Sequence, residues 1–72
     1  MAHKYVGNRL KNVRTNVGLT QAQLAEKVGV ARVSIVAIEN GRFIPTIETA
    51  LRIGRVLDVP LNQLFWLKEE TQ

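Results

Sequence analysis

Cysteine is absent from this 72-residue sequence, histidine occurs once, and no long hydrophobic run is present. Without cysteine the chain can form neither a disulfide framework nor a thiolate metal site, and the lone His3 cannot form a metal cluster. Polar residues interrupt the apolar stretches, so no segment approaches the roughly 20 apolar residues that span a bilayer. No signal peptide is predicted, because no apolar run follows the charged N-terminal residues. We therefore expect a cytoplasmic protein without a metal, a cofactor or a segment that inserts into a membrane.

The sequence also lacks the residue sets of common catalytic sites. Ser34 and His3 are the only residues of their types, and no Ser–His–acid arrangement is predicted. No glycine-rich phosphate loop precedes a helix. A chain this short buries only about 60% of its unfolded surface, which leaves little room for a substrate pocket beside a core. Neither an enzyme nor a small-molecule ligand is expected.

Basic residues exceed acidic residues. Ten Lys and Arg against six Asp and Glu give a formal net charge of +4 at pH 7. This balance favours a polyanionic partner, either nucleic acid or an anionic membrane surface. Charge alone does not specify a fold, so the choice between partners depends on the residue pattern.

That pattern predicts an all-α fold of five short helices. Apolar residues recur with helical spacing, and the alternation typical of strands is absent. Thr20 and Thr46 are N-cap candidates, glycines end several segments, and Pro60 suits the first turn of a fifth helix with Leu61, Leu64 and Phe65. The residues predicted to point inward from the first four helices are Leu10, Val13, Val17, Leu24, Ala25, Val28, Ile35, Ile38, Ile47, Ala50, Leu51, Ile53, Gly54 and Leu57.

The chain is predicted to form one domain. Residues 1–5 are expected to be an N-terminal arm, residues 6–67 the folded domain, and residues 68–72 a flexible tail. Gly54 lies inside the fourth helix, where glycine costs roughly 1 kcal/mol relative to alanine. We therefore expect a close contact between helices at this position.

Residues 19–41 carry the most informative spacing. Two short helices, the second from about 31 to 40, are joined by a tight turn. Ala25 is small enough for a close crossing, Gly29 can adopt the positive φ of the turn, and Val30 follows as an apolar plug. This is the spacing of a helix-turn-helix, whose second helix fits the roughly 12 Å major groove of B-DNA.

With these motifs the sequence resembles the Cro/cI-type (XRE-family) helix-turn-helix domains of phage repressors and small bacterial or archaeal regulators. The matching segments are GLTQAQLA at 18–25, VGV at 28–30, IVAIENG at 35–41, PT at 45–46 and LNQLF at 61–65. The resemblance covers about residues 6 to 66. It implies a compact five-helix, lambda-repressor-like domain that works as a homodimer on a two-fold symmetric operator in double-stranded DNA.

The resemblance also implies residues that contact phosphate. In the family, the residue matching Gln21 contacts a phosphate at the start of the second helix, where free N–H groups and the helix dipole favour an anion. The residues matching Asn40 and Arg42 contact the backbone in the same way, and Thr20 adjoins this set. The alternative is that Gln21 and Arg42 are ordinary solvated side chains.

The outward face of the third helix is predicted to meet the base edges. Arg32 is the best single candidate, because a guanidinium can bond both O6 and N7 of guanine. Many family members have Ser or Thr at position 31 and Gln at position 33, so Ala31 loses a hydroxyl cap and Val33 loses amide readout of adenine. The predicted base-facing residues are Ala31, Arg32, Val33, Ser34, Val36 and Ala37.

Three of these residues form an apolar stripe with two interpretations. Val33, Val36 and Ala37 fit contact with thymine methyl groups, but they also suit packing against another protein. Arg14 and Glu39 are a separate case. In the family, the matching residues form an ion pair that supports the fold, so neither residue is assigned to base reading.

The C-terminal apolar residues Leu64, Trp66 and Leu67, together with Ile44, are the predicted dimer surface. The alternative is that Trp66 caps the monomer core. The predicted function is a sequence-specific, double-stranded DNA-binding transcriptional regulator, with repression favoured over activation. The competing hypothesis is a protein-interaction module or antitoxin-like partner protein that retains the fold, and the salt dependence of binding distinguishes the two.

Overall fold

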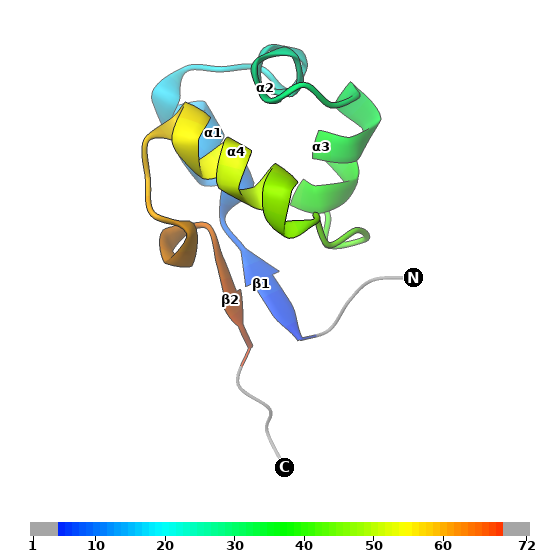
Figure 1. The fold of residues 1–72 in the computed structure, drawn as a ribbon, viewed down its shortest axis with the longest axis vertical. Helices are drawn as coiled ribbons and strands as arrows, with labels where there is room; N and C mark the ends of the chain where they lie inside the picture. The colour runs from blue at the N-terminus through cyan, green and yellow to red at the C-terminus, as the bar shows by residue number, and fades with distance from the viewer. Residues whose placement is uncertain (1–4, 69–72) are drawn as a thin grey trace.

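The computed structural model describes residues 5–68 and consists of helices packed above a small pair of strands (Figure 1). Residues 1–4 of the expected arm and 69–72 of the expected tail lie outside the described residues. The elements in chain order are β1 (Val6–Asn8), α1 (Leu10–Val17), α2 (Gln21–Val28), α3 (Arg32–Glu39), α4 (Ile47–Leu57), a 3-10 turn η1 (Leu61–Gln63) and β2 (Phe65–Leu67).

The helix boundaries follow the local sequence. Thr20 caps α2 by accepting a hydrogen bond from the Gln23 N–H, while the Gln23 side chain accepts one from the Thr20 N–H. Thr46 caps α4 through its hydroxyl. Gly18 and Gly29, both at φ +90°, end α1 and α2 in the left-handed conformation that glycine adopts without a Cβ clash. The predicted caps and stops are confirmed.

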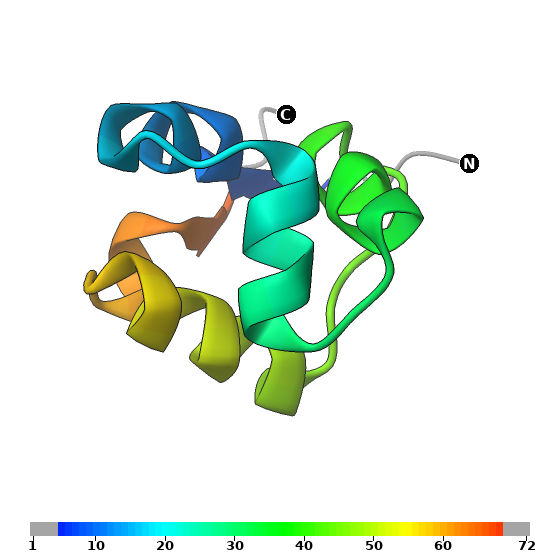
Figure 2. The same ribbon diagram turned by 90° about the horizontal axis from the view of Figure 1, so that it is seen from above.

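The core lies between the helices. Helix α2 packs against both α3 and α4, and Figure 2 shows it crossing between them. The buried apolar residues are Leu10, Leu24, Ala25, Val28, Ile35, Ile38, Ala50, Ile53, Leu57 and Leu64. Helix spacing therefore predicted most of the core correctly.

Part of the predicted inward set is wrong. Val17, Ile47 and Leu51 are exposed. Val17 is the last residue of α1 and Ile47 the first of α4, so both lie where a helix extends past the core. Leu51 directly follows the buried Ala50, and one residue in a helix turns the side chain by about 100° away from the core.

The prediction of five helices without strands is also wrong. Residues 5–68 form four α-helices, and the segment after Pro60 forms only a 3-10 turn. Strands β1 and β2 pair antiparallel, with Val6 opposite Leu67, Gly7 opposite Trp66 and Asn8 opposite Phe65. Strands of three residues are too short to show alternation, and their pairing depends on a contact between opposite ends of the chain.

The pairing extends beyond the strands. The Lys68 N–H donates to the Tyr5 carbonyl at 2.7 Å. Two residues that prediction placed in the arm and the tail therefore take part in the ordered ladder.

Gly54 makes a close contact, but not with another helix. A Cβ at this position would lie 3.1 Å from the Val59 carbonyl oxygen, and the Val59 N–H donates to the Gly54 carbonyl at 3.1 Å. The glycine therefore lets the chain fold back tightly after α4. The expectation of a helix–helix contact is corrected to this turn.

Candidate nucleic-acid interface

The turn between helices α2 and α3 is held by two backbone hydrogen bonds to one carbonyl. The Ala25 carbonyl accepts from the N–H groups of both Gly29 and Val30, at 2.8 and 3.0 Å. Ala25 is buried at the crossing, and Val30 packs against the core. The turn therefore fixes the direction in which α3 leaves α2.

Helix α3 begins without a side-chain cap. Ala31 occupies the N-cap position in an extended conformation and makes no side-chain hydrogen bond, as its lack of a hydroxyl predicts. Ile35 and Ile38 are buried and hold the opposite face of the helix against the core. The first turn of α3 consequently projects from the body of the protein.

Exposure along α3 decreases from its start. Ala31, Arg32 and Val33 are exposed, and Val33 is 71% accessible. Ser34, Val36 and Ala37 are half-buried. The N-terminal part of α3 therefore offers the most side-chain surface to a partner.

A buried ion pair joins α1 to α3. Arg14 Nε donates to Glu39 Oε2 at 2.6 Å and Arg14 Nη2 to Glu39 Oε1 at 3.3 Å, with side-chain exposures of 9% and 3%. Arg14 Nη1 also donates to the Leu19 carbonyl at 2.9 Å. The pair implied by the family resemblance is present, and it connects α3 to the turn that precedes α2.

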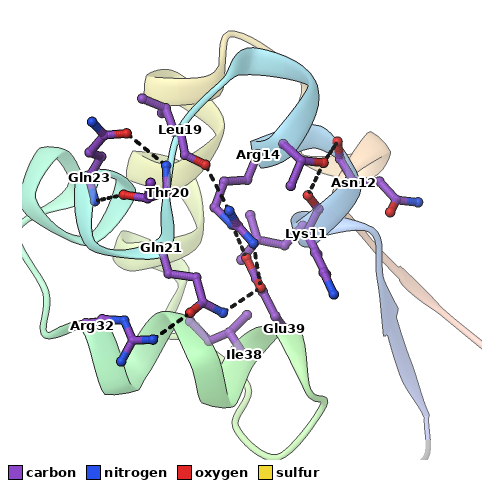
Figure 3. A network of polar contacts seen from close by, with 12 residues as sticks. Lys11, Asn12, Arg14, Leu19, Thr20, Gln21, Gln23, Arg32, Ile38 and Glu39 are labelled. Atoms are coloured by element: carbon purple, nitrogen blue, oxygen red, sulfur yellow. Dashed lines mark hydrogen bonds and ion pairs between the residues drawn. The ribbon is translucent and has the colours of Figure 1, made fainter.

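The ion pair continues outward through an amide, as Figure 3 shows. Gln21 Nε2 donates to Glu39 Oε1 at 3.1 Å, and Arg32 Nη2 donates to Gln21 Oε1 at 3.1 Å. These contacts orient the Gln21 amide and tether the guanidinium of Arg32 at the start of α3. Sequence reasoning assigned Gln21 and Arg32 separate roles and missed the connection, although both lie next to the predicted helix starts.

The segment after α3 exposes two of the predicted phosphate ligands. Asn40 ends α3, Gly41 follows at φ +74°, and the Arg42 N–H donates back to the Ala37 carbonyl at 2.9 Å. Asn40 and Arg42 are exposed, as is Thr20 before α2. Gln21 is half-buried because its amide faces Glu39.

The predicted dimer surface needs correction. Leu64 is fully buried in the core and provides no surface for a partner. Trp66 is 39% exposed, but its indole lies across Gly7, where an added Cβ would fall 2.5 Å from Nε1. Leu67, at 80%, and Ile44 remain exposed.

Exposed charges are distributed unevenly. In the described part of the chain, the exposed acidic residues are Glu26 on α2, Glu48 on α4 and Asp58 directly after α4. Five exposed basic residues lie on helices, strands or loops that carry no exposed acidic residue: Arg9, Lys11, Arg32, Arg42 and Lys68. Helices α1 and α3, the loop after α3 and the strands therefore expose basic residues without an exposed acid.

Within residues 5–68, no group of three or more His, Asp or Glu side chains is placed to bind a metal ion. None of the described helices is long and apolar enough to cross a membrane.

Comparisons with known proteins agree with this geometry. The family model HTH_3, described as helix-turn-helix, matches residues 10–64. The uncharacterized HTH-type transcriptional regulator YgzD of Bacillus subtilis is 38% identical over 63 residues, which are 88% of this chain and 96% of that protein. The cryptic phage CTXphi transcriptional repressor RstR of Vibrio cholerae is 32% identical over 93% of this chain and 62% of its own length. The crystal structure of the biofilm regulator SinR in complex with DNA superposes with a TM-score of 0.71 at 34% identity, covering 75% of this chain and 87% of that one.

Proposed function

Because the chain belongs to the HTH_3 helix-turn-helix family, we propose that it is a sequence-specific, double-stranded DNA-binding transcriptional regulator that inserts α3 into the major groove. The observation that carries this proposal is the projecting, acid-free start of α3, where Arg32 is exposed and oriented by Gln21. Repression is the favoured mode of regulation, because the similar protein RstR is named as a phage transcriptional repressor.

Base reading falls to the exposed first turn of α3. Arg32 uses one N–H on Gln21, which leaves its other donors for O6 and N7 of a guanine. Val33 supplies apolar surface for a thymine methyl group. The half-buried Ser34, Val36 and Ala37 complete the base-facing set, with Ala31 at the helix start.

Phosphate binding falls to residues on either side of α3. Gln21 donates one amide N–H to Glu39, and its second amide N–H is available to donate to a phosphate oxygen at the start of α2. Thr20 lies beside it, and Asn40 and Arg42 are exposed after α3. These contacts would fix the orientation of the domain on the duplex without reading its sequence.

The proposal includes a homodimer on a two-fold symmetric operator. Leu67 lies opposite Val6 in the strand pair and therefore shares its face. Val6, Phe43, Ile44 and Phe65 line one small recess, which makes this face continuous with the loop before α4. We assign the dimer contact to this apolar face, defined by Val6, Ile44, Phe65 and Leu67, in place of Leu64 and Trp66.

In vitro selection from random duplexes tests the whole proposal. It should return two inverted half-sites about 34 Å, or one helical turn, apart. Leu67→Asp should then weaken binding to the two-site duplex more than binding to a single half-site. Sedimentation equilibrium that finds only monomer, with and without operator, would remove the dimer from the proposal.

A second candidate function is a protein-interaction module, or an antitoxin-like partner protein. It rests on the 71% exposure of Val33, because an exposed valine suits packing against another protein. Salt separates the two candidates. DNA binding through about four to six phosphates should weaken log-linearly as salt rises, whereas an apolar protein contact should not.

A further inference from the structure

The strand pair has two chemically different faces. Residues directly opposite in an antiparallel pair share a face, and the faces alternate along each strand. Gly7 and Trp66 are opposite each other, and Tyr5 and Lys68 follow two positions outward through the 2.7 Å hydrogen bond that joins them. The aromatic–basic face therefore consists of Tyr5, Arg9, Trp66 and Lys68, and the apolar face described above lies on the other side.

The aromatic–basic face is preorganised. Trp66 lies across Gly7, and the Arg9 guanidinium carbon stands 5.1 Å from the centre of the indole ring. This is cation–π distance. The ring attracts the cation through its face, and the N–H groups that point away from the ring can donate to an anion.

The same face continues into the proposed phosphate site. Trp66 and Lys68 share a shallow hollow of about 300 Å³ with Asn40 and Gly41, the residues directly before Arg42. Glu39 also lines this hollow, but its carboxylate is paired with Arg14 and accepts from Gln21. No exposed acidic side chain of residues 5–68 lies on the strands. Lys68 therefore supplies positive charge on the strand side of the hollow, and Arg42 directly follows Gly41 on its other side.

We propose that the aromatic–basic face binds the sugar-phosphate backbone of duplex DNA beside the phosphates reached by Asn40 and Arg42. Lys68 and Arg9 supply the positive charges, and Trp66 holds Arg9 in place. This inference rests on the proposed function, because it extends the same DNA surface onto the strands. It reassigns Trp66 from the dimer contact to DNA.

Salt dependence tests the two cations. The Kd of the full chain for a random-sequence duplex is measured by fluorescence anisotropy at several salt concentrations. Each lost phosphate contact should reduce the slope of log K against log salt by about 0.9. Lys68→Gln and Arg9→Gln should each show this change. Arg55→Gln, which removes the same charge from the exposed side of α4, is the matched control and should leave the slope unchanged.

Trp66 provides an independent readout, because it is the only tryptophan of the chain. Saturating duplex should lower acrylamide quenching of its fluorescence by about twofold or more, and dilution of the free protein should not change it. If acrylamide quenching of Trp66 decreases as the protein concentration rises in the absence of DNA, Trp66 lies at a protein contact and the inference is overturned. Slopes for Lys68→Gln and Arg9→Gln equal to that of Arg55→Gln, with DNA binding intact, would also overturn it. If the unmodified chain binds no duplex at any salt concentration, the proposed function itself fails.

Discussion

Arg32 on α3 and Arg52 on α4 each hydrogen-bond to one neighbouring side chain, but the two partners differ in charge. Arg52 pairs with the Glu48 carboxylate at 2.6 Å, whereas Arg32 is held by the neutral Gln21 amide at 3.1 Å. The carboxylate neutralises Arg52 locally. The amide orients Arg32 and leaves its charge available to an external anion.

The same contrast holds for the surfaces around the two arginines. The exposed side of α4 combines the apolar Ile47 and Leu51 with one acid, Glu48, and two arginines. Helix α3 exposes Arg32 and Val33 without an exposed acid. Both surfaces combine apolar and basic residues, so composition alone does not distinguish them. The hydrogen bonds behind each arginine distinguish the two surfaces. Arg32 donates to Gln21, and Gln21 donates to the buried carboxylate of Glu39.

The largest expected effect comes from removing that carboxylate. Glu39→Ala leaves Arg14 buried and unpaired, which should lower the free energy of unfolding by about 3–5 kcal/mol. Urea denaturation followed by circular dichroism measures the change. Glu48→Ala, which removes an exposed ion pair, is the control and should cost no more than about 1 kcal/mol. Equal losses for the two variants would contradict the structural role of Glu39.

Removing the guanidinium of Arg32 should have the next largest effect, on DNA specificity. Arg32→Ala should lose about 1–3 kcal/mol of discrimination at one base pair of the selected site, because bidentate guanine contacts are worth that amount. Competition binding with duplexes changed at that base pair measures the loss. Arg52→Ala should leave discrimination unchanged, and a similar loss in both variants would be evidence against the assignment.

Giving Arg32 a charged partner would make α3 resemble α4. Gln21→Glu places a carboxylate beside Arg32 and near the proposed phosphate, which should weaken binding to all duplexes about fivefold, or roughly 1 kcal/mol. The new carboxylate also faces Glu39, which accepts from the Gln21 amide at 3.1 Å, so the variant should lose stability and is titrated where circular dichroism shows it folded. Anisotropy titrations on specific and random duplexes measure this effect. Gln21→Ala separates loss of the amide from gain of the charge, and should weaken binding less. An unchanged affinity in Gln21→Glu would show that Gln21 lies away from the DNA.

The smallest effect is expected from the reverse change on α4. Glu48→Gln releases the charge of Arg52 but should alter DNA affinity by less than about twofold, since that surface is assigned no DNA contact. The same titrations check this prediction. A clear gain in affinity would indicate that the exposed side of α4 also approaches the duplex.

Local sequence signals predicted the helix-turn-helix well. Each of these signals affects only nearby residues: Thr20 caps the helix that follows it, Gly29 ends that helix, and the spacing of Ile35 and Ile38 sets the buried face of α3. A single segment of sequence is therefore enough to predict them. The Arg14–Glu39 pair came from the family resemblance, and the hydrogen bonds from Gln21 that extend it became visible only in the structure.

The errors arise where distant segments meet. Pairing of β1 with β2 joins opposite ends of the chain, and strands of three residues are too short to carry a sequence pattern that predicts it. Leu64 was expected at a dimer contact but is buried, and Trp66 packs on Gly7, because both depend on that pairing. Ile47 and Leu51 follow helical spacing but point away from the core, since spacing does not show where the core ends.

The most direct test of major-groove reading by Arg32 replaces single guanines of the selected operator with 7-deazaguanine, which removes the N7 acceptor and leaves the base pair intact. At one position, the unmodified protein should lose about fivefold or more in affinity, and Arg32→Ala should lose nothing further. If the replacement weakens both proteins equally, or weakens neither at any position, Arg32 does not read a guanine through the major groove.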